Sequence, residues 1–332
     1  MRILLTGKNG QLGWELYRLL ERDYEVLAIG REDIDFCDVP FFVSTLGQLP
    51  KLDLIVNAAA YTDIDKAAQE PHIAEAINSE AAAILAAEAD YRGIPMIHFS
   101  TDHVFGRRRI ARPFLEDDQP YPCSVYAATK LDGELRIRSI LEKHLIFRLS
   151  GLYGCRRKNF YTAMLNHYRK GTVPRVACDR IISPNWTPLV AEAIVGAIDH
   201  LFWGGEVPWG TYHLSGSGST TPYKFARLVF ENLGNMRGNG TMFPIPGMTK
   251  KGNGMAARPK YSVLDSSRFS TVFEHSLPDW QEQLQHFIGE LNQEAPRVNN
   301  LSFRSCCASK IAKQCVKKLR CYLREYATRT EQ

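Results

Sequence analysis

A tyrosine and a lysine stand four positions apart at Tyr126 and Lys130, in the segment YAATK. If residues 124–141 form a helix, as we expect, both side chains lie on one face. A tyrosine hydroxyl has an ordinary pKa of about 10, and a neighbouring ammonium lowers that pKa by stabilising the phenolate. The pair could therefore donate a proton to an oxygen that gains negative charge, as when hydride attacks a ketone.

A second polar segment, Ser100-Thr101-Asp102, follows an apolar run at residues 95–99 that is typical of a buried strand. Ligands of open parallel sheets bind at the carboxyl ends of the strands, which is where this segment would lie. Thr101 could hydrogen-bond the same oxygen as Tyr126 and orient it. Tyrosine and lysine at this spacing also occur on ordinary surface helices, so the strand end that precedes them strengthens the chemical interpretation.

Three glycines, Gly7, Gly10 and Gly13, form a G-x-x-G-x-x-G pattern between an apolar run at residues 2–6 and helical periodicity at residues 10–21. The first would permit a tight turn, the second a close approach to a diphosphate, and the third close packing of helix on strand. The helix N-terminus would favour the negative charge. A plain strand–turn–helix corner is the alternative, but the flanking strand and helix favour dinucleotide binding.

The second predicted strand ends in Gly30 and Arg31, where a site for NAD usually has an acidic residue that binds the ribose 2′-hydroxyl. Gly30 cannot make that bond, whereas Arg31 could bind a 2′-phosphate. The sequence therefore favours NADPH, with NADH as the second option, and a solvated loop arginine is the alternative. After the third strand, the small residues Ala58, Ala59 and Ala60 would let a cofactor pass close to the backbone or serve tight packing.

These residues need a scaffold, and the hydrophobic pattern predicts alternating strands and helices. Because such alternation produces right-handed βαβ crossovers, we expect the α/β class, with a doubly wound parallel sheet of Rossmann type. We expect a dinucleotide-binding domain at 1–150, its sheet completed by about 174–214, and a smaller substrate lobe at 151–173 and 215–294. The predicted strands cover residues 2–6, 25–29, 53–57, 95–99 and 145–149, and the helices cover 10–21, 71–91, 124–141 and regions near 159–170, 187–203 and 221–234.

The composition is that of a globular protein, because 45% of the 332 residues are hydrophobic and 23% are charged. The net charge of +5 is concentrated in residues 296–332, which hold nine Lys/Arg and two Asp/Glu, a local +7, so residues 1–295 carry −2. Such near neutrality argues against nucleic acid as a partner. The sequence has no run of 18 apolar residues and no signal-peptide pattern, so we expect a cytoplasmic protein without stable membrane insertion.

Together these motifs resemble the extended short-chain dehydrogenase/reductase superfamily and, within it, the dTDP-4-dehydrorhamnose reductase family. The resemblance runs almost collinearly from residue 1 to about residue 293. It implies hydride transfer from NADPH or NADH to the C4 keto group of a dTDP-linked sugar, dTDP-4-dehydro-L-rhamnose, which gives dTDP-L-rhamnose for cell-surface polysaccharide. The matching segments are GKNGQLGWEL (7–16), VNAAAYTDIDKAAQEP (56–71), STDHVF (100–105), VYAATKLDGE (125–134), HLIFR (144–148), TYHLSGSGSTTPYKFA (211–226), RPKYSVLD (258–265) and LPDWQ (277–281).

The resemblance also implies roles at matching positions. Tyr126 would be the proton donor, Lys130 its electrostatic partner and a ligand of the nicotinamide ribose, and Thr101 the third catalytic residue. Asp102 would touch the substrate together with Thr101 and Tyr126. Some members of the family bind Mg²⁺ at a dimer contact. Glu15 fits one such ligand position, although no full ligand set can be placed. A homodimer is a further expectation. The cofactor would be lined by Gly10, Gln11, Leu12, Asp38, Val39, Ala59, Ala60 and Tyr61.

The sequence departs from the family pattern at three places. Gly151 stands where a large aromatic residue usually contacts the sugar. The loop after STDHVF holds three arginines at 107–109, and residues 183–187 (SPNWT) replace the usual G-x-P-T. These changes leave the hydride chemistry intact and bear on which sugar is bound.

Two other functions share these motifs. A non-catalytic NADP-binding regulatory subunit, such as that of eukaryotic methionine adenosyltransferase, resembles the same family, but the intact Thr101, Tyr126 and Lys130 argue against it. A nucleotide-sugar epimerase or dehydratase also uses the tyrosine and lysine. A dehydratase needs Asp-Glu after the threonine, whereas here Asp102 is followed by His103.

The C-terminal extension, residues 295–332, is basic, holds four of the eight cysteines and lies outside the family pattern. Apolar residues recur at near-helical spacing between 308 and 326, with lysines and arginines between them. Such a basic amphipathic pattern can lie on an anionic membrane surface. We expect instead a terminal addition without a role in catalysis, because nothing else in the sequence points to a membrane.

Overall fold

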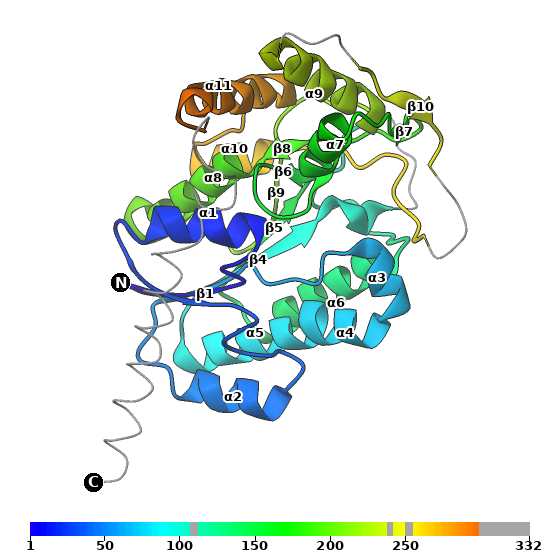
Figure 1. Cartoon of the computed structure of the whole chain (residues 1–332). Helices are drawn as coiled ribbons and strands as arrows, with labels where there is room; N and C mark the ends of the chain where they lie inside the picture. The colour runs from blue at the N-terminus through cyan, green and yellow to red at the C-terminus, as the bar shows by residue number, and fades with distance from the viewer. Residues whose placement is uncertain (107–111, 238–241, 250–254, 299–332) are drawn as a thin grey trace.

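Six parallel strands form the central sheet of the computed structural model, which describes residues 1–106, 112–237, 242–249 and 255–298. The strand order is β2-β1-β3-β4-β5-β9, and every neighbouring pair is parallel (Figure 1), which confirms the expected doubly wound α/β sheet. The order reverses between β1 and β3, the place where ligands bind in such sheets. The strands are β1 (Arg2–Thr6), β2 (Glu25–Ile29), β3 (Leu54–Asn57), β4 (Met96–Thr101), β5 (His144–Leu149) and β9 (Gly210–Leu214).

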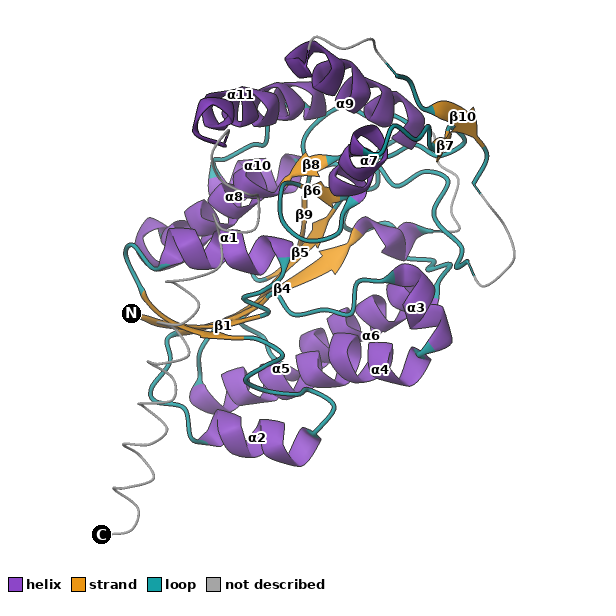
Figure 2. Ribbon diagram, viewed as in Figure 1, coloured by secondary structure: helices purple, strands orange, loops and turns teal. Residues whose placement is uncertain are grey.

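Helices cover both faces of this sheet (Figure 2). The first face carries α1 (Gln11–Leu20), α8 (Thr187–Asp199) and α10 (Ser267–Phe273). The second face carries α2 (Val39–Gly47), α5 (Ala81–Arg92) and α6 (Val125–Ile140), with the short helices α3 (Ile64–Gln69) and α4 (Pro71–Glu75) beside them.

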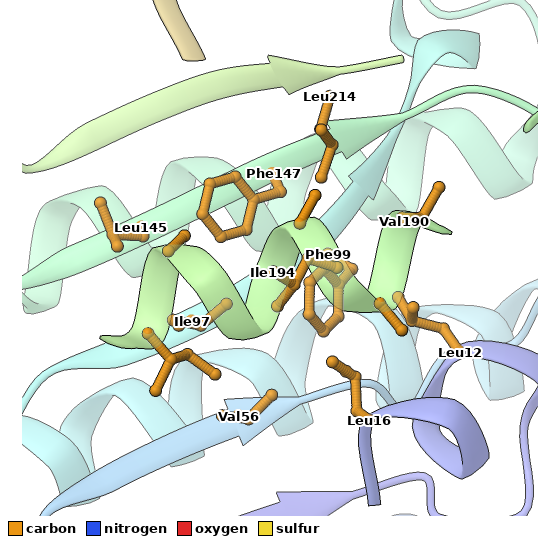
Figure 3. Close-up of a cluster of buried hydrophobic side chains, with 14 of the residues drawn as sticks. Leu12, Leu16, Val56, Ile97, Phe99, Leu145, Phe147, Val190, Ile194 and Leu214 are labelled. Carbon is orange, nitrogen blue, oxygen red and sulfur yellow. The ribbon is translucent and has the colours of Figure 1, made fainter. Parts of the chain in front are cut away.

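Apolar strand residues point alternately to the two helix layers. On β1, Ile3 and Leu5 pack against α1 and α8, whereas Leu4 packs against α2 and α5. The side chains on each face form one hydrophobic cluster. Figure 3 shows the cluster on the face of α1 and α8, in which Phe99 and Phe147 of the strands lie beside α8. Because both faces are buried, the strands read as continuous apolar runs rather than as an alternating pattern.

A third hydrophobic cluster lies beyond the carboxyl ends of the strands. It joins α7 (Phe160–Arg169), α9 (Pro222–Arg237) and α11 (Trp280–Val298), which gather on one side of the molecule (Figure 1). Two short parallel ladders complete this part. They pair β6 (Leu152–Tyr153) with β8 (Asn185–Trp186), and β7 (Arg175–Ala177) with β10 (Ile245–Gly247).

The differences from the expected elements include an interrupted helix and four helices that the sequence did not predict, α2, α3, α10 and α11. The single helix expected at 71–91 is interrupted by a π-helical turn, η1 (Ala76–Glu80), which separates α4 from α5. Helix α2 was not expected; it begins where the Asp38 carboxylate accepts a hydrogen bond from the Phe41 amide at 3.2 Å, with proline in the first turn. Helix α2 thus depends on a local cap, and η1 depends on contacts with residues distant in the sequence, rather than on hydrophobic period.

The arginines at 107–109 and the pattern at 308–326 lie outside the described residues. Among the helices of the described part, none is long and apolar enough to cross a membrane.

Candidate active site

Thr101, Asp102 and Tyr126 meet at the carboxyl end of β4. Thr101 is the last residue of that strand, and the short 3-10 helix η2 (Asp102–Phe105) begins immediately after it. The Thr101 hydroxyl accepts a hydrogen bond from the His103 amide and donates one to the Asp102 carboxylate, each at 3.1 Å. The Thr101 side chain lies next to the Tyr126 hydroxyl. The structure therefore brings Tyr126 to Thr101 and Asp102, which precede it in the sequence by 25 and 24 positions.

Helix α6 carries Tyr126 and Lys130 to this strand end. It begins at Ser124, whose hydroxyl accepts a hydrogen bond from the Ala127 amide at 3.2 Å. One turn beyond Lys130, the fully buried Glu134 pairs with Arg148 of β5 at 2.7 Å and accepts a hydrogen bond from Ser100. These bonds hold the helix against β4 and β5, so they fix which strand residues its side chains can reach.

The pKa of Tyr126 is raised, whereas the sequence predicted a lowered one. Burial raises the pKa of Tyr126 to about 12; the Asp102 charge adds to this rise, and the hydrogen bond to Thr101 opposes it. Burial also lowers the pKa of Lys130 to about 7, against the opposing charge of Glu134. The reason is desolvation, which disfavours the charged form of both groups.

Lys130 is 1% exposed, and its Nζ lies 2.9 Å from Nε2 of His98, an inward-facing residue of β4. His98 Nδ1 lies 3.1 Å from the amide nitrogen of Asn57 at the end of β3. The Asn57 amide oxygen accepts hydrogen bonds from the Thr6 hydroxyl at 2.7 Å and from the Ala59 amide at 3.2 Å. Sequence reasoning missed His98, although a polar residue inside an apolar strand was a visible signal.

The π-helical turn positions the loop that follows β3. Asn78 of this turn accepts a hydrogen bond from the Tyr61 amide at 2.8 Å and donates to the Tyr61 carbonyl at 3.2 Å and to Thr129 Oγ1 at 3.1 Å. A Cβ atom at Gly133 would lie 2.3 Å from the Asn78 carbonyl oxygen. The wider turn and the glycine thus let η1 touch α6 at Thr129, between Tyr126 and Lys130, and at Gly133, and the Asn78 bonds hold the predicted cofactor residue Tyr61.

The glycine loop has the close contacts that its pattern predicts. Gly7 has φ +75, and a Cβ there would lie 2.6 Å from the backbone of Ala58. A Cβ at Gly13 would lie 2.1 Å from the Gly7 carbonyl oxygen, so α1 packs directly on the turn. Gly10 is the N-cap of α1 and has no side chain to bond the first helical amides of Gln11 and Leu12. Those amides and the positive end of the helix dipole suit an anion.

A second loop, residues 154–159, lies against the glycine loop. Arg157 Nε donates to the Asn9 carbonyl at 2.6 Å, and Asn159 donates to the Gln11 side chain at 2.8 Å. The guanidinium of Arg156 lies 3.8 Å from the centre of the Trp14 ring. Two positive charges therefore flank the N-terminus of α1. Sequence reasoning missed them, although the run of three basic residues at 156–158 was a signal.

At the end of β2, Arg31 is exposed and lies beside acidic neighbours. Glu32 accepts two hydrogen bonds from the Asn9 amide at 2.7 Å, and Asp33 forms an ion pair with the buried Lys8. The predicted adenine contacts Asp38 and Val39 are exposed at the start of α2. A cofactor that bound along this edge would meet both the Arg31 cation and the Glu32 carboxylate.

Further cations lie near Asp102. The ring of His103 packs edge-on against Tyr126, with ring centres 6.0 Å apart. Burial lowers the pKa of His103, and the charges of Arg180 and Arg258 lower it further, against the effect of Asp102. Arg258 makes a bidentate ion pair with Asp65, with N–O distances of 3.0 and 2.8 Å. The sequence analysis did not single out Arg180 or Arg258, which lie far along the chain from the strand that they approach.

Two departures from the family pattern take structural form. A Cβ at the exposed Gly151 would meet no atom within 4 Å, so the site is open where the family has an aromatic side chain. In the segment 183–187, Asn185 is buried and bonds Ser215 at 3.2 Å and the Gly216 amide at 2.6 Å. That segment therefore links the sheet to the third hydrophobic cluster.

Glu15, the one candidate metal ligand, accepts hydrogen bonds from Arg18 at 3.0 Å. Within the described residues, no group of three His, Cys, Asp or Glu side chains is placed to hold a metal ion.

A doubly wound sheet with a glycine loop after β1 and a Thr-Tyr-Lys set at β4 defines a short-chain dehydrogenase/reductase scaffold. Residues 1–293 match the sequence family described as RmlD substrate binding domain. The dTDP-4-dehydrorhamnose reductase of Escherichia coli K12 is 36% identical over 304 residues, which cover 88% of this chain and 98% of that protein. The chain belongs to the dTDP-4-dehydrorhamnose reductase family, as the sequence motifs predicted.

Solved structures support the same assignment. A dTDP-4-dehydrorhamnose reductase ortholog from Clostridium acetobutylicum matches with a TM-score of 0.77 and 30% identity, covering 88% of this chain and 100% of that chain. The reductase from Bacillus anthracis, determined in complex with NADP, matches with a TM-score of 0.75 and 28% identity, covering 87% of this chain and 98% of that chain.

Proposed function

We propose that the protein reduces the C4 keto group of dTDP-4-dehydro-L-rhamnose with hydride from NADPH, giving dTDP-L-rhamnose for cell-surface polysaccharide. The observation that carries this proposal is the meeting of Thr101, Asp102 and Tyr126 at the carboxyl end of β4, in a chain of this family. A solved relative that binds NADP supports the cofactor.

The residues present fit a dinucleotide. Its diphosphate would lie on the amides of Gln11 and Leu12, over Gly7, Gly10 and Gly13, with Arg156 and Arg157 nearby. When bound, NADPH supplies the hydride. Ala58, Ala59, Ala60 and Tyr61 would line its path along the sheet edge, Asp38 and Val39 would touch the adenine, and Arg31 would hold the 2′-phosphate.

The protein's own groups would manage the proton. Tyr126 would donate its hydroxyl proton to the C4 oxygen as that oxygen gains negative charge, because a protonated phenol is the form the site stabilises. Thr101 would hydrogen-bond the same oxygen and orient it. Lys130 would bind the nicotinamide ribose, and Asp102 would contact the sugar.

We assign the substrate diphosphate to Arg180 and Arg258. Burial lowers the pKa of Arg180, and the charge of Arg258 lowers it further, so the two cations repel each other. Among the described residues, the buried Nε of Arg180 has no hydrogen-bond partner. An anion between them would remove the repulsion and supply that partner. The open space at Gly151 would enlarge the sugar site.

Several expectations from the sequence stay predictions: the domain boundaries, use of NADH as a second cofactor, a Mg²⁺ site that includes Glu15, a homodimer and a cytoplasmic location. No structural observation favours the regulatory-subunit or epimerase/dehydratase alternatives.

The test is an assay with dTDP-4-dehydro-L-rhamnose and either NADPH or NADH, followed by NMR of the product. We expect one NADPH consumed per sugar and a product with the configuration of L-rhamnose at C4. Cofactor binding without consumption would support a regulatory subunit instead. Sugar conversion without net cofactor consumption would support an epimerase or dehydratase.

A further inference from the structure

The amine of Lys130 lies in a site whose hydrogen-bond directions can be worked out. Lys130 is buried under α6, and its Nζ has His98 Nε2 as its one hydrogen-bond partner among the described residues. The chain of contacts continues through Asn57 to Thr6 and the Ala59 amide, across β4, β3 and β1. Each group in this chain is buried or half-buried, so the identity of donor and acceptor matters for every contact.

A backbone amide sets the direction. The Ala59 N–H can only donate, and it lies 3.2 Å from the Asn57 amide oxygen and 3.4 Å from Thr6 Oγ1. The shorter contact, together with the Thr6 hydroxyl at 2.7 Å, makes that oxygen the acceptor end of the Asn57 side chain. The Asn57 nitrogen must then donate to His98 Nδ1. Nδ1 carries no hydrogen, so the neutral ring carries its hydrogen on Nε2.

This hydrogen points at Lys130. An ammonium has only donors, so a charged lysine would set N–H against N–H in a buried site. An amine has a lone pair that accepts the Nε2 hydrogen. We propose that His98, oriented by Asn57 and Thr6, is a positioning residue that keeps Lys130 as a neutral amine in the ligand-free protein.

The surrounding charges agree with this assignment. Burial lowers the pKa of His98 well below its ordinary value, which keeps the ring neutral. On α6, Glu134 favours the ammonium form of Lys130, but its charge is already paired with Arg148 of β5 and Arg138. Tyr126, on the same helix, is a neutral phenol, and Asp102 of η2 acts on Tyr126. Burial lowers the pKa of Lys130, which favours the neutral amine.

A neutral lysine cannot stabilise a phenolate, which has a consequence for catalysis that rests on the proposed function. Lys130 would have to gain a proton before it could lower the pKa of Tyr126. Lys130 would therefore become charged only when the ligands bind.

NMR of the ligand-free, full-length protein tests the proposal without turnover. With ¹³C-labelled lysine, the Lys130 ε-carbon, assigned by comparison with Lys130→Arg, should titrate with a midpoint near pH 7, against about 10.4 for an ordinary lysine. In His98→Gln, the amide oxygen can accept from an ammonium, so the midpoint should rise by about two pH units or more. His144→Gln, which alters another buried histidine of the sheet, should leave the midpoint unchanged.

With ¹⁵N-labelled histidine, the unaltered protein should show His98 protonated at Nε2 and bare at Nδ1. A proton on Nδ1, a lysine midpoint above about 9, or a midpoint that His98→Gln does not move would each overturn the proposal. If His98→Gln does not fold, the tautomer of the unaltered protein still decides. Because no step needs substrate, failure here leaves the proposed reduction standing, and an inactive protein with the expected lysine titration would overturn the reduction alone.

Discussion

Lys130 and Arg31 lie in two regions of the candidate site that are built in different ways. Around Lys130, side chains are buried and bonded to one another: His98, Asn57 and Glu134 each have partners on other strands or helices. Around Arg31, both Arg31 and Glu32 are exposed, and the hydrogen bonds and ion pair of the Glu32 carboxylate go to Asn9 and Lys8 of the glycine loop. The first region is held by bonds among its own buried side chains, so substitutions there should affect chemistry and stability, whereas substitutions in the second should affect which ligand is preferred.

The largest expected effect comes from the buried region. Tyr126→Phe removes the proposed proton donor, and general acid catalysis of this kind contributes roughly 10²–10⁴-fold. We expect kcat to fall by about that factor while NADPH binding, measured by fluorescence titration, persists. Tyr91→Phe, which removes a hydroxyl from a fully exposed tyrosine, is the matched control. Near-normal turnover in Tyr126→Phe would exclude the proposed donor.

The second prediction concerns stability. Arg148→Met leaves the Glu134 carboxylate buried without its closest charge partner, and breaking such a pair costs about 3–5 kcal/mol in free energy of unfolding. Arg136→Met breaks an exposed pair with Asp132 on the same helix, which should cost about 1 kcal/mol or less. Urea denaturation of both variants measures the difference. Equal losses would show that burial does not set the strength of these pairs.

A smaller effect is expected at the exposed region. Arg31→Ala should raise the KM for NADPH by about tenfold, because a charge-assisted bond to the 2′-phosphate contributes about 1.5–3 kcal/mol. The KM for NADH should change little, which makes the second cofactor an internal control. Steady-state kinetics with both cofactors measure this, and equal changes would mean that Arg31 does not bind the 2′-phosphate.

The smallest effect is expected at the C-terminus. Truncation after Val298, where α11 ends, should leave kcat and the KM for the sugar essentially unchanged, because the family match ends at residue 293. Circular dichroism and the same kinetic assay check this. Loss of folding or of sugar binding would assign the extension to the catalytic structure.

The same contrast explains what could be predicted from the sequence. The strands, the glycine loop and the Tyr126–Lys130 pair depend on short spacings and on hydrophobic period, so they could be read from neighbouring residues. His98 could not be assigned a role, because its partners lie 41 and 32 positions away in the chain. The π-helical turn at Asn78 could not be predicted for the same reason. Asn78 of this turn bonds Tyr61 and Thr129, which only the folded chain brings near it.

The pairing of Asn9 with Glu32 has a consequence for redesign. In such folds an acidic residue at the end of the second strand, where this chain has Gly30, binds the ribose 2′-hydroxyl of NAD. A Cβ at that position would lie 2.7 Å from both the Asn9 amide nitrogen and a Glu32 carboxylate oxygen. Any side chain introduced there would first displace this pair and so release Glu32 from the glycine loop. An engineer who wished to convert this protein to NADH would therefore do better to begin at Asn9 and Glu32, where the acidic group already exists.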